Sequence, residues 1–337
     1  MMGEMSLRFL GLSEEKGRYL MIKSVVETEY FTLKCLSEGV YAAIAKPGQG
    51  AWSNAGIVDL GDELLVFDSF STPSAAQILR KQAEEITGKK VKYLINSHYH
   101  GDHVFGNQVF EDVTIISTSL TKKWFEDQNS LIDVAKEIEE MNRYLDNLKN
   151  QLESTIDPIL NCSLSNQYLE MSKVLEELPH LKMVFPSVIF EKHLVIQGSN
   201  RYVELHCLGG GHSPSDAFLY LPIEKIAFMG DIVTEDLHLP IYDPDEFLRI
   251  LNEVNKREIE TIIPGHGDVS TLELCDTMEN YLSFLINKVK EALDNKVSLH
   301  DFISEFITPS EYSNWKGVNG ITRNLTALYN FYATKEE

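Results

Sequence analysis

The feature that most constrains this chain is the run HYHGDH at residues 98–103, which directly follows the apolar segment 91–95. It contains four side chains able to bind a metal: His98, His100, Asp102 and His103. Zinc takes imidazole nitrogen and carboxylate oxygen at about 2.0–2.2 Å. Two histidines one residue apart at a strand end can point into one cavity, and the next two side chains then face a neighbouring volume. The turn therefore offers ligands to two adjacent metal ions.

Further acids and imidazoles follow apolar, strand-like runs elsewhere in the chain. His212 comes after three successive glycines, which permit a tight turn. Asp231 follows a run that reads as a buried strand, where a carboxylate needs a partner such as a metal. His266 lies in a Pro-Gly-His-Gly turn, and Asp68 ends another short apolar run. A surface loop would explain any one of these turns, but the set favours a shared metal site.

Apolar runs and periodicity predict an alternation of strands and helices in both halves of the chain. Strands are expected at 64–67, 91–95, 113–116, 188–196, 202–208, 217–221, 226–229 and 262–263. Helices are expected at 73–86, 274–289 and 321–332. Helices packed on a sheet are the expected result.

The segment between about 120 and 181 differs in character, because it is charged, favours helix and has almost no glycine. Apolar residues recur at three- and four-residue spacing in two stripes, at 138–152 and 168–178, which predict two amphipathic helices. Asp157-Pro158 marks the boundary between them. The seam of this hairpin is expected to close on itself or on the main body. A lid over the metal site and a dimer contact are the functional alternatives.

Composition limits the classes of function. The 337 residues, 43% of them hydrophobic, are enough for a large buried core. The net charge of −21 disfavours nucleic acid and anionic membrane surfaces as partners. No apolar run approaches membrane-spanning length and no secretory signal is recognised, so we expect a cytoplasmic protein. The cysteines are scattered without a Cys-x-x-Cys pair, which disfavours a disulfide framework: Cys35, Cys162, Cys207 and Cys275.

The ordered motifs, from the run at 98–103 to the turn around His266, resemble the metallo-β-lactamase-fold hydrolase superfamily over about residues 39–293. The resemblance implies an αββα sandwich, with two mixed sheets face to face and helices outside, and the segment at 120–184 becomes an α-helical hairpin insertion. The expected organisation is an N-terminal extension (1–20), two halves of the main domain (21–119 and 185–293), the helical insertion (120–184) and a C-terminal helical extension (294–337).

The resemblance also implies a division of the ligands between two zinc ions, with iron or manganese as alternative metals. It assigns His98, His100 and His212 to one ion and Asp102, His103 and His266 to the other, with Asp231 bridging both. Asp68 is expected to orient a ligand ring by accepting its second hydrogen bond, and Ser213 to support the His212 turn. The best-known lactamases have a cysteine where Asp231 stands, so the pattern resembles glyoxalase II and general hydrolases more closely.

The function predicted from these residues is hydrolysis of a small ester, thioester, lactone or amide by a metal-bound hydroxide. Asp102 and Asp231 are the candidate catalytic residues, and Asp102 is expected to orient the nucleophile. His238, in a loop after Asp231, is a candidate for the pocket wall. The alternative is a non-catalytic metal-binding or ligand-sensing protein. The expected partner is a small-molecule substrate, and a homodimer through the insertion or the C-terminal helix remains open.

Overall fold

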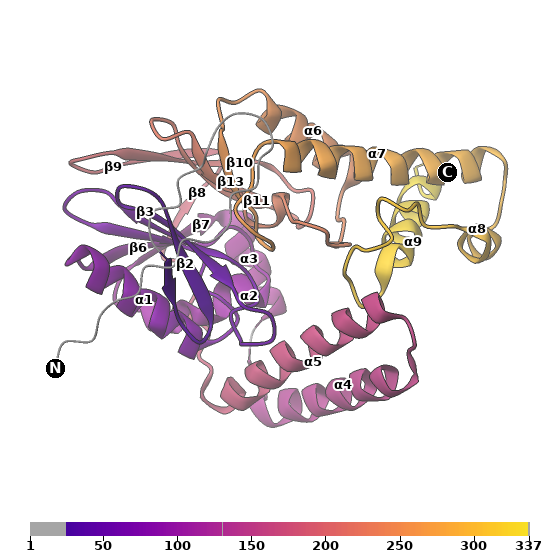
Figure 1. Ribbon diagram of the computed structural model, residues 1–337, viewed down its shortest axis with the longest axis horizontal. Helices are drawn as coiled ribbons and strands as arrows, with labels where there is room; N and C mark the ends of the chain where they lie inside the picture. The colour runs from indigo at the N-terminus through magenta and orange to yellow at the C-terminus, as the bar shows by residue number, and fades with distance from the viewer. Residues whose placement is uncertain (1–24, 130, 336–337) are drawn as a thin grey trace.

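A computed structural model describes residues 25–129 and 131–335 of the chain. Two mixed β-sheets form the centre, with helices on their outer faces (Figure 1). This confirms the predicted αββα sandwich. The expected N-terminal extension, residues 1–20, lies outside the described residues.

The first sheet has eight strands in chain order, antiparallel from β1 to β5 and parallel from β5 to β8. Its strands are β1 (Val25–Glu27), β2 (Phe31–Ser37), β3 (Val40–Ala45), β4 (Ala55–Asp59), β5 (Leu64–Phe67), β6 (Val91–Ile95), β7 (Thr114–Thr118) and β8 (Val188–Phe190). The parallel part places the ends of β5 and β6, which precede Asp68 and His98, at one edge.

The second sheet has five strands in the order β13-β12-β11-β10-β9, and only the β12–β13 pair is parallel. Its strands are β9 (His193–Gln197), β10 (Tyr202–Gly209), β11 (Asp216–Leu221), β12 (Ile226–Phe228) and β13 (Thr261–Ile263). The ends of β10, β12 and β13 precede His212, Asp231 and His266, so the second sheet supplies the remaining candidate ligands.

The predicted strand at 188–196 is wrong as a single element. Its first part, β8, pairs with β7 in the first sheet, and its last part, β9, pairs with β10 in the second sheet. The exposed pair Glu191 and Lys192 connects them at a bend. A continuous apolar pattern does not show which sheet a strand joins, because both sheets here turn one face to the same core.

The helices lie in three places. Helix α1 (Pro73–Thr87) packs its buried residues on the first sheet, starting at the N-cap Thr72 and ending at the left-handed Gly88. On the side of the second sheet, α6 (Pro244–Asn255) packs on β10, α7 (Glu273–Asp294) packs on α6, and α9 (Gly320–Ala333) packs on α7, farther from the sheets (Figure 1). The others are α2 (Gly101–Val104), α3 (Ser119–Gln128), α4 (Val134–Ser154), α5 (Pro158–Glu177) and α8 (Leu299–Glu305). Within the described ranges, no helix is both long and apolar enough to cross a bilayer.

Helices α4 and α5 form the predicted hairpin, which lies beside the sheets and below α9 in Figure 1. Leu145, Leu148 and Leu164 are buried along its seam, and Val318 from the C-terminal part packs against them. Asp157 caps α5 by accepting hydrogen bonds from the backbone N–H groups of Ile159 and Leu160. The apolar stripe therefore closes on itself, with one contact from the segment that precedes α9.

Candidate metal centre

The seven candidate ligands converge at one edge of the sandwich, although they come from both sheets. His98, His100, Asp102 and His103 follow β6, with Asp102 and His103 inside the short helix α2. Asp231 lies in the 3-10 turn Gly230–Ile232. The side chains form two groups. The first cluster is His98, His100, His212 and Asp231, and the second cluster is Asp102, His103 and His266.

Three imidazoles of the first cluster face one another. Nδ1 of His100 lies 2.9 Å from Nε2 of His98 and 2.9 Å from Nε2 of His212. Tetrahedral zinc with bonds of about 2.0–2.1 Å separates its ligand nitrogens by about 3.3 Å. Both distances are thus within a few tenths of an ångström of the spacing that one zinc ion requires.

The carboxylate of Asp231 lies between the two clusters. Its Oδ2 is 3.3 Å from Nε2 of His212 and 3.9 Å from Nε2 of His98. Its Oδ1 is 3.3 Å from Nε2 of His103 and 3.5 Å from Nε2 of His266. Each oxygen therefore faces a different group of histidines, which is the arrangement of a carboxylate that bridges two metals.

The second cluster is completed by Asp102. Its Oδ2 lies 3.2 Å from Nε2 of His266 and 3.6 Å from Nε2 of His103. This cluster therefore combines two imidazoles with a carboxylate of its own and shares a second carboxylate, Asp231. It has one carboxylate more than the first cluster, which has three imidazoles around the same shared carboxylate.

Four of the rings have their other nitrogen held by the protein. Nδ1 of His212 is 2.8 Å from the carbonyl oxygen of Pro240, and Nδ1 of His266 is 3.1 Å from that of Trp52. Nδ1 of His98 lies 3.0 Å from Oγ of Ser97. Such contacts fix the tautomer and the orientation of the ring. In each of these rings, Nε2 is the nitrogen turned toward the cluster.

Asp68 holds the fourth ring, that of His103, through a buried network. Its Oδ2 is 2.8 Å from Nδ1 of His103 and accepts a hydrogen bond from Oγ of Ser97 at 2.8 Å, while Oδ1 accepts from the Ser97 N–H at 2.8 Å. The backbone of Asp68 is left-handed, with φ of 60°. Such a conformation costs about 1–3 kcal/mol and persists where surrounding contacts maintain it.

The charges of the site differ between the two clusters. Burial and the neighbouring His212 lower the pKa of His100 to about 3, so this ring is neutral and has a free lone pair. Burial opposes ionisation of Asp102, but His103 and His266 outweigh it and lower its pKa to about 2. Burial likewise opposes protonation of His266, yet Asp231 and Asp102 raise its pKa to about 10.

These residues fit a dinuclear metal site. Nε2 of His103 and Oδ1 of Asp231 are buried and have no hydrogen-bond partner among the described residues. A buried polar atom without a partner costs about 1–3 kcal/mol, and a metal between these two atoms would satisfy both. The set of imidazoles and carboxylates is the one that zinc and similar divalent metals accept.

The turn that carries His212 is braced by Asp216, which sequence reasoning did not single out. Its carboxylate accepts hydrogen bonds from the N–H groups of Gly211, His212 and Ser213. Oγ of Ser213 also donates to Asp216, at 2.5 Å, and to the Ser215 carbonyl. The hydroxyl of Ser213 therefore supports the turn and does not face the clusters.

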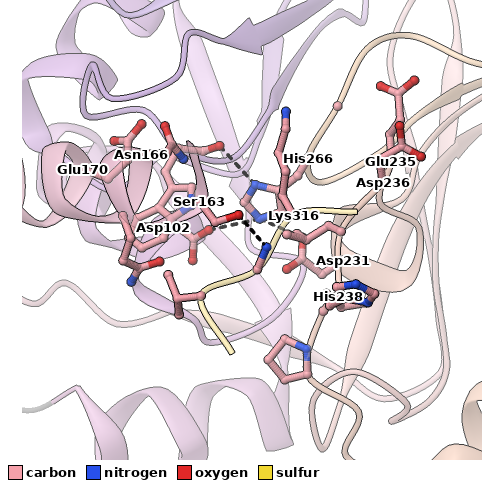
Figure 2. A pocket seen from close by; sticks show the side chains of 18 of the residues that line it. Asp102, Ser163, Asn166, Glu170, Asp231, Glu235, Asp236, His238, His266 and Lys316 are labelled. Atoms are coloured by element: carbon pink, nitrogen blue, oxygen red, sulfur yellow. Dashed lines mark hydrogen bonds and ion pairs between the residues drawn. The ribbon is translucent and has the colours of Figure 1, made fainter. Parts of the chain in front are cut away.

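A cavity of about 460 Å³ opens onto both clusters. Figure 2 shows Ser163, Asn166 and Glu170 of α5 on one side and Asp231 with His238 on the other. The segment 316–323, which leads into α9, completes the wall. The helical insertion and the C-terminal extension thus both line the same pocket, a role that no local sequence pattern reveals.

Three of the histidines outside the two clusters bear on the site or resemble a ligand group: His193, His206 and His238. His238 is at the pocket wall, but its Nδ1 is 2.8 Å from the hydroxyl of Tyr281 and its ring packs on Trp315. His206 and His193 stack on the outer face of the second sheet beside Glu204. A guanidinium nitrogen of Arg257 lies 3.4 Å from Nε2 of His206, which places a positive charge where a cation would bind.

Sequence reasoning also missed Trp52, Ser97 and Glu170, each of which touches a candidate ligand or the loop beside one. Ser97 directly precedes His98 in the run after β6, so its place beside the motif was the available signal. Trp52 and Glu170 have no such signal, because they reach the site from elements distant in the chain.

Comparisons with known proteins agree with this fold. The family model described as the Metallo-beta-lactamase superfamily matches residues 52–266, more than half of the chain. A double mutant of the sec-alkyl sulfatase PisA1 matches with a TM-score of 0.63 and 16% identity, covering 89% of this chain and 50% of that one. The chain therefore spans about half the length of that sulfatase. A metallo-beta-lactamase from Pontibacter korlensis matches with a TM-score of 0.51 and 15% identity, covering 77% and 98%. At these identities the likeness is one of fold.

Proposed function

The chain belongs to the metallo-beta-lactamase superfamily, and from its site we propose that it is a dinuclear, zinc-dependent hydrolase of a small ester, thioester, lactone or amide. The observation that carries this proposal is the position of Asp231, whose two oxygens face different groups of histidines. A protein that bound a single metal would have no use for a second group of imidazoles and carboxylates on the other side of this residue.

When bound, two divalent ions would polarise the oxygen of a scissile carbonyl and lower the pKa of an attacking water. The protein supplies the orientation. Asp102 is ionised and lines the cavity, so its carboxylate can orient the attacking water by accepting a hydrogen bond from it. Asp231 and the five imidazoles would hold the two ions. Asp68 keeps the ring of His103 in one tautomer.

The pocket supports a small-molecule substrate. Its volume of about 460 Å³ lies in the range of about 300–1,000 Å³ that is typical of small-ligand sites. Its walls mix apolar side chains such as Ile44 and Leu239 with polar ones such as Asn166. We propose that α5 and the segment 316–323 select the substrate.

The test combines metal content with a substrate screen. Purified protein loaded with zinc is expected to hold about two ions per chain and to hydrolyse members of a panel of chromogenic esters, thioesters, lactones and amides. His212→Ala removes an imidazole of the first cluster, and Asp231→Ala removes the shared carboxylate. Both are expected to lose metal and activity. His193→Ala is the matched control, because this exposed histidine lies on the outer face of the second sheet.

Each outcome is informative about the two candidate functions. Two bound ions with turnover that the site variants abolish would support the hydrolase. Two bound ions without turnover on any panel member would favour a metal-binding or ligand-sensing protein. Folded wild-type protein that binds no zinc would contradict the proposal.

A further inference from the structure

Glu170 of the helical insertion is a fully buried carboxylate that contacts the main body of the protein. Its Oε1 accepts a hydrogen bond from the N–H of Gly48 at 2.7 Å, and its Oε2 accepts one from the N–H of Gly50 at 2.8 Å. Both glycines belong to residues 46–54, between β3 and β4, which we call the glycine loop. One side chain thus binds the loop with both of its oxygens.

The glycine loop is closely fitted to α5. Gly48 and Gly50 have left-handed backbones, with φ of 73° and 96°. A Cβ atom on Gly48 would lie 2.8 Å from the side chain of Leu169, and one on Gly50 would lie 3.1 Å from Cβ of Lys173. Side chains at these positions would push the loop away from the helix. The backbone N–H groups reach Glu170 because only glycine allows this approach.

The last three residues of the same loop, Trp52, Ser53 and Asn54, contact the second cluster or the backbone beside it. The carbonyl oxygen of Trp52 lies 3.1 Å from Nδ1 of His266. Oγ of Ser53 donates a hydrogen bond to the backbone oxygen of Asp102 at 2.5 Å. Asn54 donates from Nδ2 to the carbonyl oxygens of Pro264 and Gly267, both at 2.9 Å, on either side of His266. The loop therefore holds two ligands of the second cluster.

The loop is strained where it meets His266. Trp52 has a left-handed backbone with φ of 63°, which is unfavourable for a bulky side chain. Strain of this kind persists only where neighbouring contacts maintain it. Oγ of Ser71 and Oγ1 of Thr72 hold the carbonyl of Gly50 from the side of α1, at 2.8 and 2.7 Å. Glu170 holds the N–H groups of the loop from the opposite side, that of α5.

We propose that Glu170 is a positioning residue for the second cluster, acting through the glycine loop on His266 and Asp102. The inference rests on the proposed dinuclear site and adds a role for the insertion. The insertion is then a fixed wall that holds the shape of the metal site, in place of a lid that swings away from it. Ser163 of α5 contacts a second part of the protein, the segment before α9, because its Oγ accepts a hydrogen bond from the N–H of Gly317 at 3.0 Å.

The test is the metal affinity of each cluster in Glu170→Gln, measured by equilibrium titration with zinc and with Co²⁺, whose visible spectrum reports coordination geometry. The substituted amide keeps the shape of the side chain but presents an NH₂ group to one of the two backbone N–H donors. Glu177→Gln is the matched control, because Glu177 also lies in α5 and accepts a backbone N–H, that of Ser74 at 3.0 Å, outside the glycine loop. Titrations at about pH 8 keep the Glu170 carboxylate ionised.

The expected result is a loss of about tenfold in affinity for the second ion, with the first ion bound as in the wild type, since loss of an outer partner weakens metal binding by about 10–100-fold. Glu177→Gln should bind both ions normally. Two outcomes would overturn the inference: unchanged binding in Glu170→Gln, or equal weakening of both ions, which would indicate a general defect of the fold. Wild-type protein that does not bind two ions would instead overturn the proposed function on which the inference rests.

Discussion

Oδ2 of Asp68 lies 2.8 Å from Nδ1 of His103, and both side chains are completely buried. This contact turns Nε2 of His103 toward Asp231, from which it is 3.3 Å away. Asp68 comes from the end of β5 and His103 from α2 after β6, two neighbouring parallel strands. The parallel pairing of β5 and β6 thus places the Asp68 carboxylate next to Nδ1 of His103, the ring nitrogen that faces away from Asp231.

Asp68→Asn is expected to weaken zinc binding at the second cluster by about 10–100-fold. The amide removes the charge that orients His103 and cannot accept all three hydrogen bonds that reach the carboxylate. Asparagine tolerates the left-handed backbone at this position, so the fold should be retained. Zinc titration with a competing chelator measures the effect. Asp59→Asn, at the end of β4 where the carboxylate pairs with Lys89, is the control. Equal affinities in Asp68→Asn and the wild type would contradict this role.

Asp231→Asn is expected to reduce metal binding at both clusters, because each oxygen of the carboxylate faces one of them. The loss of activity should exceed the roughly 100-fold that removal of an outer partner causes. Metal analysis after gel filtration and a hydrolysis assay measure the two effects. Asp236→Asn is the control, because Asp236 is exposed at the rim of the same cavity. A variant that keeps two ions would show that Asp231 is not shared.

Gly265→Ala is expected to displace Asp231 without changing any candidate ligand. A Cβ atom at this position would lie 2.0 Å from Oδ1 of Asp231 and 2.8 Å from the backbone of Gly230. Relieving such an overlap typically costs about 1–3 kcal/mol of stability, and metal affinity should fall as well. Thermal unfolding with and without zinc measures both. Gly88→Ala is the control, because nothing lies within 4 Å of its Cβ position and only left-handed backbone strain is added. If the two variants bound zinc equally well, the overlap would be irrelevant.

The stability of the metal-free protein is expected to carry a pH dependence from Glu170. Burial raises the pKa of its carboxyl to about 7, against the opposing N–H groups of Gly50 and Gly48. The native state therefore keeps a proton that the unfolded chain releases at about pH 4.5, so this group makes stability fall as pH rises through that window. Between about pH 5.5 and 8, the difference in unfolding free energy between Glu170→Gln and wild type should shift by about 2 kcal/mol in favour of the variant. Urea unfolding with a chelator present tests this, and parallel pH profiles would contradict it.

Much of the fold was accessible from local patterns. The stripes at 138–152 and 168–178 predicted the hairpin that α4 and α5 form, because helical spacing records which face of a helix is buried. The apolar runs before His98 and His266 predicted β6 and β13. The segment at 188–196 was wrongly predicted as one strand, because its apolar pattern is compatible with either sheet. The change of sheet occurs at two exposed residues.

The sequence by itself determined which metal-binding groups the site contains, because imidazoles and carboxylates that recur at the ends of apolar runs are typical of a metal site. Only the tertiary structure decided how they are arranged: that the two oxygens of Asp231 face different clusters, and that Trp52 and Glu170 reach the site from other elements. Contacts between residues more than a hundred positions apart depend on how sheets and helices pack. The local spacing of side chains along the sequence does not predict that packing.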